Sequence, residues 1–253
     1  MKCSKLVKLY LFSLVLLLSP SLALAEELTI VTGEWAPYMG KELPGNGFLN
    51  EIVTKAYAEV GINVNFVYMP WKRVSELEVG RYNAISSAWV WNKEREKKWR
   101  LSEKITQGED ILVTHKNSNI SWKTLGDLKP YHLGTTLGYS YGDEFDRFKT
   151  QLMIESVPSD IINLKKVLAG RIDAFVVNRM VAASLIRSYF TPEQRKEFKF
   201  VVDPLIGQRS LHLVCSKTYK KCSGYLAKFN QGLRLITDNG AKRRIVDQAA
   251  SME

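Results

Sequence analysis

Four short segments combine aromatic, cationic and hydroxyl side chains where a predicted strand gives way to a loop or helix. The first, Trp35-Ala-Pro-Tyr38, lies in a loop rich in glycine and proline. Tryptophan and tyrosine each join a large apolar ring to a polar tip, so Trp35 and Tyr38 could offer a flat stacking surface. The alternative is that both rings only pack the loop.

The second segment, Pro70-Trp71-Lys-Arg73, opens a predicted helix. A cation is unfavourable near the positive end of a helix dipole. Arg73 is therefore a candidate to hold a carboxylate or phosphate through its guanidinium, with Trp71 beside it. A solvated Arg73 is the alternative.

The third segment, Ser86-Ser-Ala-Trp-Val90, ends a predicted strand and is followed by Arg95. Its small residues, Ser87 and Ala88, leave backbone groups accessible as far as Val90. Arg95 could then clamp an anion with two parallel hydrogen bonds. The alternative is an arginine on a helix surface within a mixed run of charges.

The fourth segment leads from a strand through Tyr139, Ser140 and Tyr141 into a predicted helix. Backbone N–H groups at the start of a helix attract anions, and the hydroxyls of Ser140 and Tyr141 add hydrogen-bonding groups. Turns flanked by glycine are common, so this segment is a weak signal by itself.

The common catalytic patterns are absent from the sequence. It contains no G-x-S-x-G, H-E-x-x-H, P-loop or G-x-G-x-x-G pattern. The histidines are far apart along the chain and do not have the spacing of zinc ligands; they are His115, His132 and His212. We therefore expect no catalytic residue, no metal site and no cofactor.

Residues 1–25 have the organisation of a signal peptide. Three lysines precede an almost unbroken apolar run, and Ala23-Leu-Ala25 fits the small-x-small cleavage rule. We predict cleavage before Glu26 and a periplasmic location. An uncleaved anchor is the alternative, but the apolar run is short for a membrane span.

Export would leave two of the three cysteines, Cys215 and Cys222. An oxidising compartment and an even number of cysteines favour a disulfide between them. Two buried thiols are the alternative.

Composition narrows the class of protein. The chain has 253 residues, of which 45% are hydrophobic, and a formal net charge of +10. It is too apolar for a disordered protein and long enough for one large domain or two small ones. Acidic and basic residues are interspersed, which favours a solvated basic surface with an anionic ligand over nucleic-acid binding.

Strand and helix patterns alternate along the chain. Strands are expected at 28–32, 64–68, 84–90 and 111–114, with helices at 48–60 and 71–78. After a polar break at 116–119 the alternation restarts, with strands at 132–135, 172–177 and 198–202 and helices at 142–148, 159–169 and 178–189. A strand at 211–215 and helices at 223–237 and 241–248 complete the pattern. This alternation indicates an α/β fold with a mostly parallel sheet.

The interruption indicates two lobes. We expect residues 26–116 to form the first part of lobe 1, residues 117–204 lobe 2, and residues 205–253 a return segment of lobe 1. Ser159 and Ser223 are the expected N-caps of the helices that they precede. Two segments would then cross between the lobes and form a hinge.

The order of these motifs resembles the bacterial extracellular solute-binding proteins of family 3, the type associated with polar amino acid uptake. The resemblance covers nearly the whole mature chain. It rests on Trp35-Ala-Pro-Tyr38, Gly47-Phe48, Gly80-Arg-Tyr-Asn-Ala84, Ser86-Ser87, Glu94-Arg95, Leu101-Ser102, Thr124-Leu-Gly-Asp-Leu128, Leu133-Gly-Thr-Thr-Leu-Gly138 and Leu168-Ala-Gly-Arg-Ile-Asp-Ala174. It implies a two-lobed periplasmic-binding-protein-like (type II) clamp with a two-strand hinge.

The resemblance also implies roles for the four segments. An aromatic residue in the first loop stacks on the ligand, which corresponds to Trp35. A ligand carboxylate would be bound by Ser87 and by the backbone of Ala88 and Val90. Arg95 would clamp the same carboxylate. The second lobe would supply N–H and hydroxyl groups from Tyr139, Ser140 and Tyr141.

Asn178 departs from the family pattern. Amino-acid binders usually have an aspartate near this position to pair with the ligand's α-ammonium group, whereas asparagine carries no charge. Either another acid such as Glu34 compensates, or the ligand lacks a free α-amino group, because a desolvated ammonium without a counter-charge is costly.

The resemblance implies a monomeric periplasmic protein that binds a small anionic or zwitterionic solute, an amino acid or a related compound, for delivery to a membrane permease. Two alternatives stay open. One is a sensing protein that feeds a signalling receptor. The other is a cyclohexadienyl-dehydratase-like enzyme on the same fold, with Glu34 or Glu51 as the acid.

Overall fold

The computed structural model describes residues 26–76, 84–201 and 208–250. Several predictions concern residues outside these ranges. They are the signal peptide with Cys3, most of the Gly80–Ala84 motif and the boundary between residues 204 and 205. Within the ranges, no helix combines the length and apolar character needed to cross a membrane.

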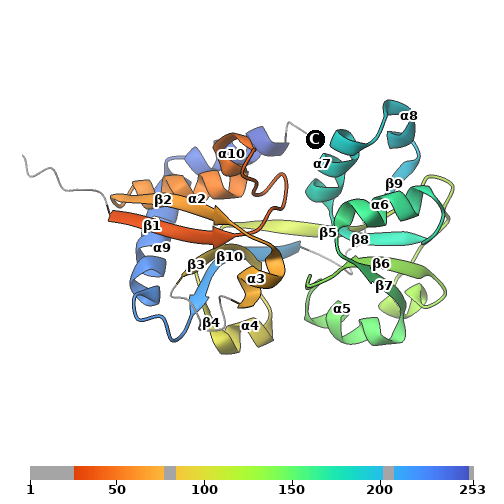
Figure 1. Cartoon of the computed structure of the whole chain (residues 1–253), viewed down its shortest axis with the longest axis horizontal. Coiled ribbons are helices and arrows are strands. Elements are labelled where there is room, and N and C mark those ends of the chain that lie inside the picture. The colour runs from red at the N-terminus through yellow and green to blue at the C-terminus, as the bar shows by residue number, and fades with distance from the viewer. Residues whose placement is uncertain (1–25, 77–83, 202–207, 251–253) are drawn as a thin grey trace, which may run out of the picture.

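Ten described strands form one sheet with two groups of helices (Figure 1). The strand order is β2-β1-β3-β10-β5-β8-β6-β7, with β4 on β10 and β9 on β5. The strands are β1 Glu26–Thr32, β2 Ile62–Tyr68, β3 Ile85–Val90, β4 Trp99–Leu101, β5 Thr106–His115, β6 His132–Thr136, β7 Met153–Val157, β8 Ala174–Asn178, β9 Phe198–Val201 and β10 Gln208–Ser216. The α-helices are α2 Phe48–Ala58, α3 Trp71–Glu76, α4 Lys93–Lys98, α5 Asp143–Phe148, α6 Asp160–Leu168, α7 Arg179–Tyr189, α8 Pro192–Arg195, α9 Cys222–Asp238 and α10 Ala241–Ala250. Within the described ranges there are also the 3-10 helices η2 Pro44–Asn46, η4 Leu125–Leu128 and η5 Lys149–Gln151.

The first lobe comprises β1, β2, β3, β4 and β10 with α2, α3, α4, α9 and α10 (Figure 1). Its core forms because α2 repeats apolar residues at helical spacing and buries one face, including Leu49 and Ile52. Helix α9 packs against α2 at Gly232, where an added Cβ would lie 1.7 Å from the carbonyl oxygen of Ala56. Glycine at this position therefore sets how closely the two helices approach.

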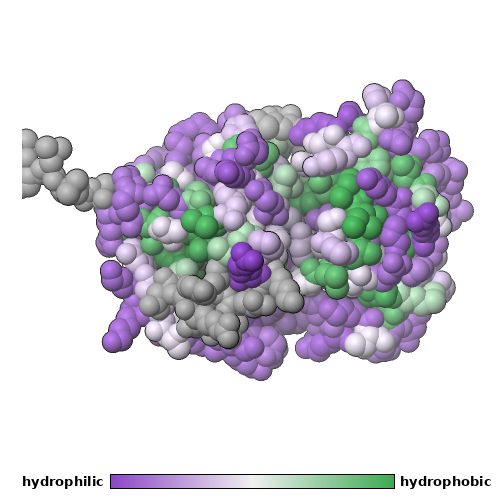
Figure 2. All heavy atoms as spheres, in the orientation of Figure 1, coloured by the Kyte–Doolittle hydropathy of each residue, from purple (hydrophilic) through white to green (hydrophobic). Residues whose placement is uncertain are grey.

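The second lobe comprises β6, β7, β8 and β9 with η4, α5, α6, α7 and α8 (Figure 1). Gly134 on β6 lets the side chain of Asn163 on α6 approach the sheet, because an added Cβ would lie 2.4 Å from Asn163 Oδ1. In the view of Figure 2, hydrophilic side chains surround areas of apolar side chains, and the larger of these areas lies over the second lobe.

Strand β5 pairs with strands of both lobes. Residues 106–109 pair with β10, residues 110–114 pair with β8, and residues 112–115 pair with β9. Because β5 passes from one lobe to the other, it joins these strands into a continuous sheet. The proposed lobe boundaries themselves remain a prediction.

The expectation of a mostly parallel sheet is wrong. β1 is parallel to β2 and β3, and β6 is parallel to β7 and β8. All described pairings of β10 and β5 are antiparallel. The sheet is mixed because the strands that join the lobes run against the parallel strands of each lobe.

The disulfide is confirmed, and the two cap predictions have different outcomes. Cys215 and Cys222 are bonded, with their Cα atoms 5.9 Å apart, and join β10 to the start of α9. Ser159 occupies the N-cap position of α6, but its side chain makes no capping hydrogen bond. The cap prediction for Ser223 is wrong, since Lys221 precedes α9 and Ser223 lies inside the helix.

Candidate ligand site

A cavity of about 370 Å³ lies between the two lobes. The first lobe contributes the loop after β1, the start of α3, the end of β3, α4 and the start of β10. The second lobe contributes the turn after β6. The described residues that line the cavity are Trp35, Trp71, Ala88, Trp89, Val90, Arg95, Leu137, Gly138, Tyr139, Ser140 and Arg209. Seven of these residues are ligand-binding candidates predicted from the sequence.

Tryptophan rings form one wall of the cavity. Trp35 stacks on the buried Tyr38, with ring centroids 4.4 Å apart and an angle of 16° between the planes. Tyr38 therefore supports the stacking ring from behind and does not itself line the cavity. The Nε1 atom of Trp35 is buried without a hydrogen-bond partner among the described residues.

Trp71 is held by its neighbours. Its Nε1 donates a hydrogen bond to the carbonyl oxygen of Glu34 at 3.0 Å, and its ring meets Trp89 edge-on at 5.5 Å. Only glycine fits at position 33, because an added Cβ would lie 2.5 Å from the Trp71 ring. Glycine at position 33 thus leaves space for the ring of Trp71 beside the cavity.

Arg95 is fixed at the cavity by aromatic and backbone contacts. Its Cζ atom lies 4.7 Å from the centroid of the Trp89 ring, within the range of a cation–π interaction. Its Nη1 donates to the carbonyl oxygen of Val90 at 2.7 Å. Asn92 caps α4 by accepting a hydrogen bond from the backbone N–H of Arg95 at 2.8 Å. The helix start and the end of β3 therefore orient the guanidinium together.

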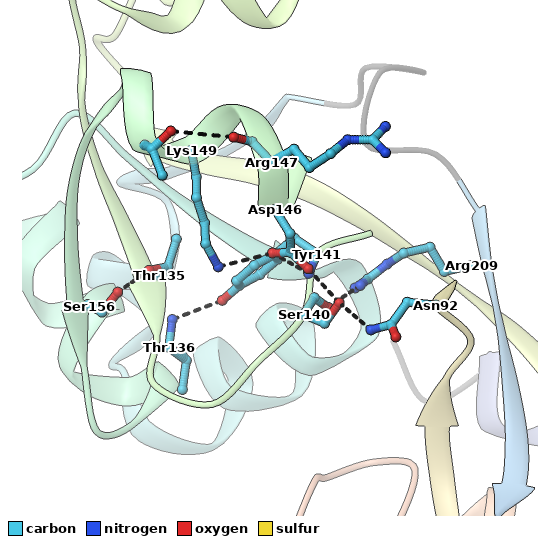
Figure 3. A network of polar contacts seen from close by, with 11 residues as sticks. Asn92, Thr135, Thr136, Ser140, Tyr141, Asp146, Arg147, Lys149, Ser156 and Arg209 are labelled. Atoms are coloured by element: carbon cyan, nitrogen blue, oxygen red, sulfur yellow. Dashed lines mark hydrogen bonds and ion pairs between the residues drawn. The ribbon is translucent and has the colours of Figure 1, made fainter. Parts of the chain in front are cut away.

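Arg209 supplies a second guanidinium group at the cavity, and no sequence motif predicted it. It forms an ion pair with Asp110 on β5, whose side chain is only 2% exposed, and Nη1 donates to the carbonyl oxygen of Ser140. Figure 3 shows Arg209 reaching from β10 to this turn of the second lobe. Burial, followed by the positive charge of Arg95, lowers the pKa of Arg209 to about 9, so it is still charged at neutral pH.

The turn after β6 presents Tyr139 and Ser140 to the cavity. Ser140 Oγ donates to Asp146 at 2.6 Å and accepts a hydrogen bond from Asn92 Nδ2 at 3.3 Å (Figure 3). Because Asn92 belongs to the first lobe, this contact bridges the lobes. Tyr139 donates to Asp160 at 3.2 Å.

Asp160 is buried behind Tyr139. The hydroxyl of Thr136 also donates to it, at 2.5 Å. Burial is the largest cause that raises the pKa of Asp160, and burial followed by the charge of Asp160 raises the pKa of Tyr139. The carboxylate therefore holds the turn rather than facing the cavity.

Four further predicted residues do not line the cavity. Ser87 is fully buried, with Oγ 3.1 Å from both Thr32 Oγ1 and Asn50 Oδ1. Tyr141 is buried, and its hydroxyl accepts a hydrogen bond from the backbone N–H of Thr136 at 2.8 Å (Figure 3). Arg73 is exposed on α3, and Asn178 is buried at the N-cap of α7. Their roles as ligand contacts remain predictions.

Within the described ranges, no group of three or more histidine, cysteine, aspartate or glutamate side chains is arranged to hold a metal ion. Cys215 and Cys222 are joined to each other and lie in the core of the first lobe. The cavity thus offers guanidinium groups, aromatic rings and hydroxyls to a bound molecule.

Residues 28–250 match the model of the bacterial extracellular solute-binding proteins, family 3. The chain belongs to this family. The match confirms the resemblance inferred from the succession of motifs, and it covers both lobes.

Two curated relatives of this family member are L-cystine-binding proteins. TcyJ of Escherichia coli K12 is 23% identical over 158 residues, which cover 61% of this chain and 59% of that protein. TcyA of Bacillus subtilis 168 is 22% identical over 203 residues, which cover 79% of this chain and 70% of that protein. The match thus spans less than two thirds of the length of the E. coli relative.

Solved structures share the fold. A histidine kinase sensor domain with similarity to periplasmic binding proteins aligns with a TM-score of 0.72 at 20% identity, covering 88% of this chain and 96% of that one. The ancestral amino acid-binding protein AncCDT-1, a precursor of cyclohexadienyl dehydratase, aligns with a TM-score of 0.69 at 20% identity, covering 88% and 94%. These likenesses show the two-lobed type II clamp that the sequence predicts.

Proposed function

We propose that this protein is an exported solute-binding protein that captures a small carboxylate-bearing solute, an amino acid or a related compound, between its two lobes. The observation that carries the proposal is the pair of guanidinium groups, Arg95 and Arg209, that line one aromatic cavity between the lobes. Guanidinium groups bind carboxylates through charge-assisted, planar hydrogen bonds.

Solute capture would bring the lobes together. Arg95 and Trp35 belong to the first lobe, whereas Tyr139 and Ser140 belong to the second. A ligand that contacts both sets stabilises the closed arrangement relative to the open one, because its contacts are complete only when the lobes are close. Cleavage before Glu26 would release the protein into the periplasm.

Delivery to a membrane permease is the family-based part of the proposal. The cystine-binding relatives support an amino acid or a related compound as the class of solute. Sensing is the second candidate function, and the fold shared with a histidine kinase sensor domain favours it. Both functions use the same ligand-binding step.

The enzyme alternative has less support in the site. Glu34, one of the two candidate acids, is not among the cavity-lining residues, and its carboxylate accepts hydrogen bonds from the backbone N–H of Lys41 at 3.3 Å. Glu51, the other candidate, lies on α2 and also does not line the cavity. A catalytic acid needs to reach the substrate.

Intrinsic tryptophan fluorescence tests the proposal. Trp35, Trp71 and Trp89 line the cavity, so a solute bound there changes their emission. We expect saturable changes with some members of a set of amino acids, other carboxylates, amines and short peptides, and only with members that carry a carboxylate. Saturable binding of amines alone, or of no member of the set, contradicts the proposal.

A further inference from the structure

We infer that the ligand is a carboxylic acid with an apolar body about the size of one aromatic ring and no ammonium group. The inference deepens the proposed function and rests on it.

Three aspartates lie behind the cavity wall rather than on it. Asp110 is paired with Arg209, Asp146 accepts from Ser140 at 2.6 Å, and Asp160 accepts from Tyr139 at 3.2 Å. In each case the carboxylate binds the side chain of a lining residue. None of the described lining residues is acidic.

The cavity therefore presents hydrogen-bond donors and positive charge. Arg95 and Arg209 are the cationic residues among the described lining residues, and the guanidinium of each carries only hydrogen-bond donors. An acceptor satisfies such groups and an ammonium group cannot, because it has only donors.

An ammonium group in this cavity would lose its hydration without gaining a counter-charge. Asn178 does not supply an acceptor there, because its Oδ1 accepts the backbone N–H of Val181 at 3.2 Å and caps α7. Asp110 on β5 is the register partner of Asn178 on β8, and its buried carboxylate is already paired with the guanidinium of Arg209. Recruiting Asp110 to an ammonium would leave the Arg209 guanidinium buried without its partner.

The size and lining of the cavity determine how large and how apolar the body of the ligand can be. A volume of about 370 Å³ lies near the lower end for small-molecule sites, which run from roughly 300 to 1,000 Å³. Three tryptophans, Leu137 and Tyr139 make most of the wall apolar. A single ring on a short carboxylate chain matches both properties.

Three matched probes test the inference by calorimetry on the exported chain. 3-Phenylpropanoate carries the ring and the carboxylate, L-phenylalanine adds an ammonium group, and 2-phenylethylamine carries the ammonium group alone. We expect 3-phenylpropanoate to bind at least about tenfold more tightly than L-phenylalanine, because like charge and lost hydration penalise the ammonium. We expect no heat of binding from 2-phenylethylamine.

Variants of the buried pair provide a second readout. Arg209→Gln leaves Asp110 without its partner, so this variant should gain affinity for L-phenylalanine relative to 3-phenylpropanoate. The double variant Arg209→Gln with Asp110→Asn removes both charges and should lose that gain. Circular dichroism checks that each variant is folded, and the wild-type probe series decides the inference if a variant is not.

The outcomes separate the inference from the proposed function. L-Phenylalanine binding as tightly as 3-phenylpropanoate overturns the inference, and so does no binding of 3-phenylpropanoate at millimolar concentration. If amino acids then change the tryptophan emission, the proposed function still holds and only the inferred ligand class is lost. If no carboxylate changes it, the proposed function fails as well.

Discussion

Arg209 couples the cavity to a buried carboxylate. Arg209 is paired with the negatively charged Asp110 on β5 and lies near the positively charged Arg95 on α4. The rings of Tyr38 and Tyr141 lie nearby. The ion pair neutralises Asp110 within the wall, whereas Arg95 adds a positive charge at the cavity. The net effect is a site that attracts anions at neutral pH.

The lowered pKa of Arg209 predicts how anion affinity depends on pH. The protonated guanidinium binds the anion, and its pKa in the folded protein is about 9. The dissociation constant for a bound carboxylate should therefore stay constant between pH 6 and 8 and rise as the pH passes about 9, by at most about tenfold per pH unit. Calorimetry across this range measures the change.

Arg209→Gln is the control for this pH dependence. The variant binds the carboxylate more weakly but has no guanidinium to titrate at position 209, so its dissociation constant should not rise near pH 9. Circular dichroism at each pH confirms that both proteins stay folded. An equal rise in the variant would assign the pH dependence to another group.

At the scale of elements, the close contact between α2 and α9 depends on Gly232. An added Cβ there would lie 1.7 Å from the carbonyl oxygen of Ala56, so the helices would have to separate. We expect Gly232→Ala to lower the free energy of unfolding by about 2–3 kcal/mol, as overpacking does. Urea unfolding measures this change.

Gly224→Ala on the same helix is the matched control. No atom lies within 4 Å of an added Cβ at position 224, so the substitution changes helix propensity without a clash. It should raise the free energy of unfolding by up to about 1 kcal/mol. A similar loss of stability in both variants would refute the packing explanation.

The sequence predicted elements with strong periodicity better than polar or short ones. α2, α6, α7 and α9 each bury one apolar face, and the 3.6-residue pattern located them. The first half of β5 is polar, with the sequence TQGED, and becomes a strand because it pairs with β10. The three-residue β4 and the largely exposed β7 carry too little apolar patterning to predict.

The same limits apply to the candidate site. Searching where predicted strands end found Trp35, Arg95 and Ser140, because parallel strands bring their carboxyl ends to one edge of a sheet. Arg209 escaped this search because β10 is antiparallel to β3, so the start of β10 meets the end of β3. Ser87 was predicted from its position at the end of a strand, but its side chain is buried and its hydroxyl hydrogen-bonds to Thr32 and Asn50.

At the scale of the whole molecule, one continuous sheet carries both halves of the cavity. β5 extends through both lobes, while Asn92 and Arg209 of the first lobe contact Ser140 of the second (Figure 3). Under the proposed function, a solute bound between these groups would strengthen the contact between lobes. Capture and closure would therefore be a single event.

The role of Arg95 as the carboxylate clamp can be tested by calorimetric titration of Arg95→Gln. The titrant is the carboxylate that binds the wild-type protein most tightly. Arg100→Gln, an exposed arginine on β4 outside the cavity, is the matched control. We predict a loss of affinity of about tenfold to a hundredfold for Arg95→Gln, as expected for a charge-assisted hydrogen bond, and wild-type affinity for Arg100→Gln. Unchanged affinity in a folded Arg95→Gln protein would contradict this role.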